Sequence, residues 1–115
     1  MSGQDARQRH VVFADEKIKE AFDKLKAGTS EEQELYRLIS RAADGLKESP
    51  FVGIKIPKTV WPKKYVQKYA INNLWKYDLP DGWRLIYTVK GSTLEIVSII
   101  LEWFDHKNYE RRFGY

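Results

Sequence analysis

The spacing of apolar residues changes from helical to strand-like near Phe51, and this change constrains the fold more than any other feature. Over residues 15–28, and again over 30–46, apolar residues recur at the i, i+3, i+4 spacing of amphipathic helices. Over residues 52–56, apolar residues instead alternate with Gly53 and Lys55, as in a strand with one buried face. The pattern therefore predicts two consecutive helices followed by strands.

Local signals bound the two helices. Asp15 is placed to cap the start of the first helix, and Gly28 to end it. Ser30, with Gln33 three residues later, forms a capping box for the second helix. Because few residues join the two helices, we expect them to pack as an antiparallel hairpin.

The second half of the chain predicts a β-hairpin followed by a longer strand. Residues 74–79 and 83–89 flank Asp81-Gly82, a pair typical of two-residue hairpin turns because glycine accepts a positive φ. A further turn leads into a strand over 94–103, where apolar residues on both faces favour a central position in the sheet.

Three shorter elements complete the expected order: a strand over 11–14, a short helix over 63–69 that follows Pro62, and a last helix from the cap Asp105 to Phe113. The result is an α+β fold. An N-terminal helical hairpin and a short C-terminal helix would pack on a mostly antiparallel sheet of four to five strands. We expect residues 1–9 to form a flexible N-terminal arm and residues 10–115 to form a single domain.

Composition excludes several kinds of site. The 115 residues include no cysteine, which excludes disulfides and thiolate metal sites. With His10 and His106 as the two histidines, a multi-histidine metal centre is excluded too, and we expect no cofactor. No apolar run approaches the roughly 20 residues that span a bilayer, and no signal peptide opens the chain. We therefore expect a cytoplasmic protein without a membrane partner.

Positive charge is concentrated in the middle of the chain. Residues 51–90 carry eight Lys or Arg against two Asp, a net charge of +6, whereas the whole chain carries +4. Aromatic residues interleave with these cations, and such a combination can bind phosphates and stack on unpaired bases. A solvated lysine face over an aromatic core explains the same pattern. The candidate RNA-binding residues are Lys55, Lys58, Lys63, Lys64 and Lys76, with Arg111 and Arg112 near the C-terminus.

Arg84 lies on an apolar strand, where alternation directs it away from Trp83 and toward the face of Ile86. A guanidinium there is costly unless it has a partner. One explanation is a salt bridge to Asp78 or Asp81 across the hairpin. The other is a phosphate clamp, because the planar fork of arginine suits two phosphate oxygens at once.

His106 begins the predicted last helix, and histidine is suited to general acid or base catalysis near neutral pH. Tyr109 lies three residues later and is expected on the same helical face. Its hydroxyl can hold a phosphate oxygen, or its ring can simply pack in the core. For a histidine taken alone, an exposed position on a helical turn with no role is the more common case.

These residue types suit RNA cleavage without a metal. The 2′-hydroxyl of a ribose attacks the adjacent phosphate, which requires a base, positive charge on the phosphorane and an acid for the leaving 5′-oxygen. His106 can serve as acid or base, Arg84 as charge stabiliser and Tyr109 as positioning group. Deoxyribose lacks the nucleophile, so DNA would be spared.

The element order, together with Trp83-Arg84-Leu85-Ile86-Tyr87 and a later His106-x-x-Tyr109, resembles the RelE/ParE toxin superfamily. The resemblance covers most of residues 10–113 and is closest to the RelE/YoeB/YafQ-like mRNA interferase branch. It implies a small toxin of a type II toxin–antitoxin system that cuts mRNA on the ribosome. By the same resemblance, Arg84 would bind the scissile phosphate, His106 would be the catalytic histidine, and Lys55 and Lys58 would contact the RNA backbone. Some members of the family use a glutamate as base, and Glu102 and Asp105 are candidates for it by position.

The resemblance also implies partners: mRNA on the ribosome and an acidic antitoxin, which would cover the basic 51–90 surface or add to a sheet edge. A homodimer is also possible. Two other functions suit the same sequence. One is a non-catalytic RNA- or ribosome-binding protein that keeps the basic surface. The other is a ParE-like gyrase inhibitor, which would need no catalytic histidine.

Overall fold

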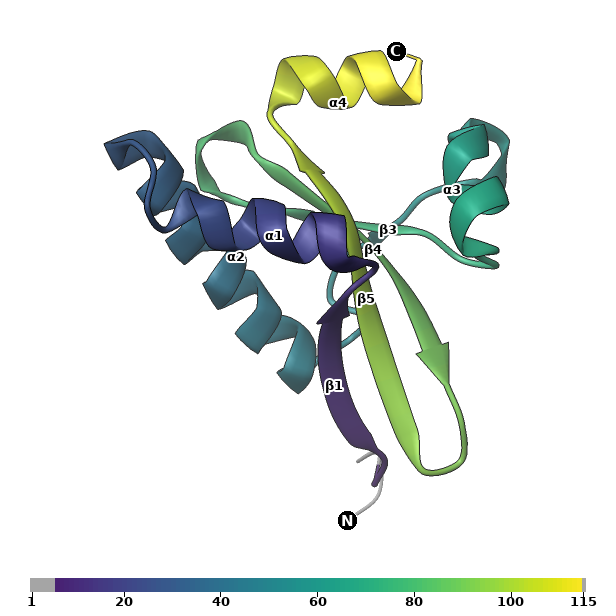
Figure 1. Cartoon of the computed structure of the whole chain (residues 1–115). Coiled ribbons are helices and arrows are strands. Elements are labelled where there is room, and N and C mark those ends of the chain that lie inside the picture. Colours follow the sequence, from purple (N-terminus) through teal and green to yellow (C-terminus); the bar gives the residue numbers. More distant parts are fainter. Residues whose placement is uncertain (1–5, 115) are drawn as a thin grey trace.

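The computed structural model describes residues 6–114 and shows an α+β fold, as predicted. Figure 1 shows one twisted sheet with helices around it. The strands are β1 (Gln8–Phe13), β2 (Ile54–Lys55), β3 (Trp75–Asp78), β4 (Arg84–Gly91) and β5 (Glu95–Phe104). The helices are α1 (Glu16–Leu25), α2 (Ser30–Glu48), α3 (Lys63–Tyr69) and α4 (His106–Phe113), and short 3₁₀ turns lie at Lys58–Val60 and Pro80–Gly82.

The sheet has the strand order β1-β5-β4-β3-β2. Strand β1 runs parallel to β5, and the other neighbours are antiparallel, which confirms the mostly antiparallel expectation. The longest strand, β5, lies between β1 and β4 and is internal, as its apolar faces predicted. The register pairs Arg84 with Phe104, so β4 begins where β5 ends.

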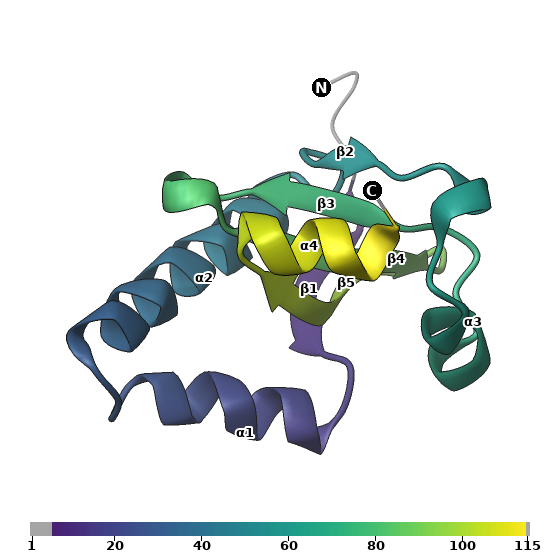
Figure 2. The same cartoon turned by 90° about the horizontal axis from the view of Figure 1, so that it is seen from above.

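The two faces of the sheet bury separate hydrophobic clusters. Helices α1 and α2 cover one face, and their apolar side chains pack against Leu85, Tyr87 and Ile100 of the sheet. The cluster on the other face joins Ile86 of the sheet to residues of α3 and α4. Seen from above in Figure 2, α4 lies across the end of the sheet at which β5 leaves it.

Side-chain caps set the starts of the main helices. The Asp15 carboxylate accepts a hydrogen bond from the Ile18 amide at 2.9 Å, confirming Asp15 as the N-cap of α1. The predicted Ser30 box was wrong, because Thr29 and Glu32 form the reciprocal capping box of α2 one residue earlier. Helix α1 also ends at Leu25, before Gly28. Asp105 caps α4 as expected, accepting from the Asn108 amide at 2.8 Å.

Strand bounds differ from the expected ones at three places. Strand β1 begins at Gln8, so part of the expected 1–9 arm is paired with β5, while residues 1–5 lie outside the described residues. Strand β2 is confined to Ile54–Lys55. The hairpin turn is a three-residue 3₁₀ turn over Pro80–Gly82, with φ of 62° at Asp81 and 79° at Gly82. The positive φ expected of Gly82 is confirmed, but the loop is longer than two residues.

Candidate functional site

The fold brings Arg84, His106 and Tyr109 together at the end of the sheet. Arg84 is the first residue of β4, and α4 starts two residues after its register partner Phe104. The first turn of α4 therefore returns over Arg84. The Arg84 Nη2 atom lies 3.3 Å from Nδ1 of His106, and its Cζ lies 5.4 Å from the centroid of the Tyr109 ring.

Arg84 is largely buried, with 19% of its side chain exposed, and it has several partners. Its Nη1 donates to the Gly82 carbonyl at 2.8 Å, and its Nε lies 3.3 Å from Oδ1 of Asp78. The predicted salt bridge to Asp78 is therefore present. The Nε contact lacks hydrogen-bond geometry, because Nε is buried without a hydrogen-bond partner among the described residues. A guanidinium has five N–H groups, so this one keeps donors for a further anion.

His106 is exposed and lies between two charged groups. Its Nδ1 faces Arg84, and its Nε2 lies 2.8 Å from Oε1 of Glu110. Because a guanidinium can only donate, Nδ1 must accept, which places the proton of the neutral ring on Nε2 facing Glu110. Glu110 was not among the residues predicted from the sequence, although its position four residues after His106 on a helix places it beside the imidazole.

Tyr109 contacts Arg84 from the same side of α4 as His106, in line with their spacing, but Tyr109 is buried whereas His106 is exposed. The Tyr109 side chain is buried and its ring packs against Phe113, with centroids 4.7 Å apart. Two cations lie over this ring: Arg84 and, at 5.3 Å, the ammonium of Lys76. Tyr109 thus forms an aromatic floor beneath the positive charge.

A second polar cluster surrounds Glu102 of β5. Its carboxylate accepts from the Tyr65 hydroxyl at 2.6 Å and from Lys64 Nζ at 3.3 Å, and Arg112 Nη2 lies 3.6 Å away. Burial, and then the neighbouring carboxylate, raise the pKa of the Tyr65 phenol above its usual range. Two expected RNA-binding residues, Lys64 and Arg112, therefore face an internal carboxylate, and Glu102 is occupied as an acceptor.

The other expected RNA-binding residues differ in their surroundings. Lys55, Lys58 and Lys63 are exposed, and within residues 6–114 their side chains have no hydrogen bond or ion pair. Arg111 is exposed too, whereas Lys76 is half-buried, 4.0 Å from Asp78. Residues 57–73 cover the sheet: Tyr65 and Ile71 of this segment are buried in the cluster that contains Tyr109.

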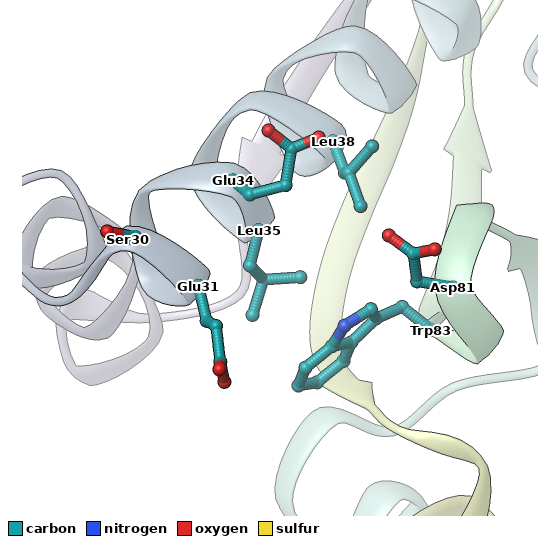
Figure 3. Close-up of a pocket in the computed structure, with 7 residues that line it drawn as sticks. All are labelled: Ser30, Glu31, Glu34, Leu35, Leu38, Asp81 and Trp83. Carbon is teal, nitrogen blue, oxygen red and sulfur yellow. The ribbon is translucent and has the colours of Figure 1, made fainter.

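Two hollows lie beside Trp83. The first, of about 390 Å³, lies between α2 and the hairpin turn; Figure 3 shows an apolar floor with carboxylates around it. It is lined by Ser30, Glu31, Glu34, Leu35, Leu38, Asp81 and Trp83. The second, of about 490 Å³, lies under α4 and is lined by Trp83, Trp103, Phe104, Asp105, Asn108, Arg111 and Arg112.

Comparisons with known proteins returned nothing: no family model, no curated protein and no solved structure matches this chain. No group of three or more His, Asp or Glu side chains that could hold a metal ion occurs within residues 6–114. In the same part of the chain, no helix has the length and apolar character to cross a membrane.

Proposed function

We propose that this chain is the toxin of a type II toxin–antitoxin system, an endoribonuclease of the RelE type that cleaves ribosome-bound mRNA without a metal. The observation that carries the proposal is the contact between Arg84 and His106 above the Tyr109 ring. This contact places a guanidinium, which can bind an anion, next to an imidazole at the surface, which can transfer a proton. Metal-free phosphodiester cleavage needs both groups.

The reaction follows from where these groups lie. As the 2′-oxygen bonds to phosphorus, the P–O5′ bond breaks, giving a 2′,3′-cyclic phosphate and a free 5′-hydroxyl. Arg84, with N–H groups left over from its internal contacts, would bind the non-bridging oxygens that gain charge. His106 would transfer a proton at the 2′- or the 5′-oxygen, with Glu110 beside Nε2 to accept or return it. Tyr109 would act by holding Arg84 in place, because its ring is buried.

The exposed cations would hold the rest of the RNA. Lys55, Lys58 and Lys63 have no internal partner within the described residues, so binding a phosphate would displace no ion pair. Such contacts add affinity that depends on salt and not on base sequence. Lys76, over Tyr109 beside Arg84, would add charge next to the scissile phosphate.

An antitoxin would bind near the β2 edge of the sheet. Phe51, Val52 and Ile54 are large apolar residues with 51%, 51% and 54% of their surface exposed, next to the exposed Lys55 and Lys58. An acidic segment with apolar side chains could pair with this edge strand and cover the basic surface.

Primer extension on an mRNA in a reconstituted translation system tests the proposal. We expect the wild type to cut at ribosome-occupied codons and His106→Ala to lose this cleavage. His10→Ala is the matched control, because it removes the other histidine, which lies on β1. If wild type binds ribosomes without cutting mRNA, the ribonuclease function is excluded.

One observation favours a non-catalytic RNA- or ribosome-binding protein as the second candidate. Asp78 lies beside the Arg84 guanidinium and Glu110 beside the His106 ring, so both groups have internal partners. Under this function, Arg84→Ala would weaken ribosome binding and His106→Ala would leave it unchanged. The gyrase-inhibitor alternative predicts altered DNA supercoiling, again without dependence on His106.

A further inference from the structure

The four tryptophans of this chain fall into two pairs. Trp61 donates its indole N–H to the Ile56 carbonyl at 2.9 Å, and Trp75 donates to Oδ1 of Asn73 at 3.1 Å. Trp83 and Trp103 have no indole hydrogen bond within the described residues, and both are half-buried. Within residues 6–114 neither nitrogen is a buried atom left without a partner, so both indole N–H groups are open to solvent. Two half-exposed indoles that border the same hollow offer ring surface to a ligand.

This hollow lies close to the Arg84–His106 pair, because residues that line it are direct neighbours of Arg84 and His106 in the chain. Trp83 immediately precedes Arg84, and Asp105 immediately precedes His106. Side chains alternate along a strand, so Trp83 faces the side opposite to Arg84, and Trp103, the register partner of Leu85, faces that side too. The hollow and the proposed cleavage site therefore lie on opposite sides of the same end of the sheet. Trp83 and Asp105, which line the hollow, are each one residue away from Arg84 and His106.

The opposite wall of the hollow comes from the polar side of α4. Arg111 is exposed and has no ion pair among the described residues, so its charge is free for an anion. Asn108 is exposed as well and offers both hydrogen-bond donors and an acceptor. Aromatic faces on one side, with an amide and a free guanidinium on the other, match the chemistry of a nucleotide: a flat base, a polar base edge and a phosphate.

We propose that the hollow under α4 binds an unpaired nucleobase of the RNA strand, the one adjacent to the phosphate bound by Arg84. The base stacks on Trp103 and Trp83, Asn108 contacts its edge, and Arg111 binds its phosphate. The hollow measures about 490 Å³, within the range of small-ligand sites. This inference rests on the proposed function, because it takes the substrate to be single-stranded RNA at the Arg84–His106 pair.

The test is a titration of the ¹⁵N-labelled full chain with a 2′-O-methyl RNA hexanucleotide, which cannot be cleaved, followed by the indole N–H signals. We expect the Trp83 and Trp103 signals to shift and saturate together, while those of Trp61 and Trp75 stay in place. Arg111→Ala should weaken binding roughly 10-fold. Arg41→Ala, which removes an exposed arginine of α2 away from the hollow, should bind like wild type.

Trp103→Leu should weaken binding by roughly 10-fold or more through loss of stacking. The exposed Arg111 variant keeps the test decisive if Trp103→Leu fails to fold. Absence of shifts at Trp83 and Trp103, or equal weakening by Arg41→Ala, would overturn the nucleobase site. If those signals stay fixed while wild type still cuts ribosome-bound mRNA, the hollow inference fails and the ribonuclease proposal stands. If they move but no mRNA is cut, a base-binding site stands without the ribonuclease.

Discussion

The Nη2 atom of Arg84 lies 3.3 Å from Nδ1 of His106, although 22 residues separate the two in the chain. The β4–β5 register closes this gap, since Arg84 pairs with Phe104 and the helix cap Asp105 follows at once. The contact fixes the imidazole through one nitrogen and leaves the other facing Glu110. We therefore expect loss of Arg84 to let the imidazole reorient, whereas Arg84 keeps its contacts with Gly82 and Asp78 when His106 is lost.

Replacing Arg84 tests whether mRNA cleavage needs the planar guanidinium or only its positive charge. Arg84→Ala should lower the rate of mRNA cleavage by about 10²–10³, the usual cost of losing a donor that stabilises transition-state charge. Arg84→Lys should recover little of this, because the three donors of an ammonium share one nitrogen and cannot reproduce the spread, planar contacts of a guanidinium with Gly82, His106 and a phosphate. Primer extension with a time course measures both rates.

Arg41→Ala controls for the loss of one exposed positive charge and should cleave at the wild-type rate. Full activity in Arg84→Lys would mean that the guanidinium geometry has no role. The Arg84 side chain would then act as a point charge, and its contact with His106 would be unimportant for the reaction.

Gly53 is held against the sheet with no space for a side chain. A Cβ at this position would lie 2.5 Å from the Lys76 carbonyl oxygen and 2.7 Å from the Tyr87 hydroxyl. That hydroxyl accepts from the Gly53 amide and donates to the Pro50 carbonyl, and burial raises the pKa of Tyr87 to about 12. Gly53→Ala should therefore lower the free energy of unfolding by about 1–3 kcal/mol, as measured by urea denaturation.

Gly91→Ala is the matched control for this substitution. Its added methyl group would approach the end of the flexible Arg7 side chain at 3.0 Å, with no backbone atom closer than 3.6 Å. We expect a change within about 0.5 kcal/mol. An equal loss of stability in the two variants would show that the contacts of Gly53 with β3 and β4 are unimportant.

Which parts of this structure are predictable depends on how local their causes are. The order of elements, the internal position of β5 and the caps Asp15 and Asp105 follow from apolar spacing and residues within one turn. The short β2 was not predictable, because the alternation over 52–56 implies a buried face, yet Val52 and Ile54 are exposed. Sequence periodicity does not say whether another element covers a strand.

The candidate site, too, has parts that the sequence predicts and parts that it does not. Arg84 and His106 can be identified as candidate site residues from the sequence, because Arg84 follows a hairpin turn and His106 begins a helix. The partners of Glu102 come from α3 and α4, at separations that no local pattern encodes. The hollow beside Trp103 also requires the register of β4 against β5.

Tyr65→Phe tests whether Glu102 has a structural role. The Tyr65 hydroxyl is fully buried and bonds to Glu102 at 2.6 Å, so its loss should cost about 1.5–3 kcal/mol of unfolding free energy. Tyr36→Phe, from a half-buried tyrosine of α2, should change stability by less than about 0.5 kcal/mol. Glu102→Gln should still cut mRNA, because an amide oxygen can accept from Tyr65. A 100-fold loss of cleavage with stability unchanged would instead identify Glu102 as the general base.

Asp15 should make stability depend on acid pH. Its carboxylate accepts from the Ile18 amide and from the Tyr69 hydroxyl, both at 2.9 Å, and lies 3.2 Å from Lys68 Nζ. The amide hydrogen bond, followed by those from Tyr69 and Lys68, lowers the pKa of Asp15 from 3.8 to about 2. The unfolded chain therefore binds the proton first as pH falls. The stabilisation is complete above about pH 4 and is lost as pH falls through about 2.

Asp15→Asn isolates this contribution, because asparagine still caps the helix but carries no charge. We expect the wild type to be more stable than Asp15→Asn at pH 5, by about 1 kcal/mol. The difference should shrink steadily between pH 4 and pH 2 in urea unfolding measured at constant ionic strength. Asp44→Asn, which removes an exposed carboxylate of α2, controls for the loss of one negative charge. A difference between wild type and Asp15→Asn that stayed constant down to pH 2 would mean that Asp15 acts as a neutral cap and that its contacts with α3 add nothing.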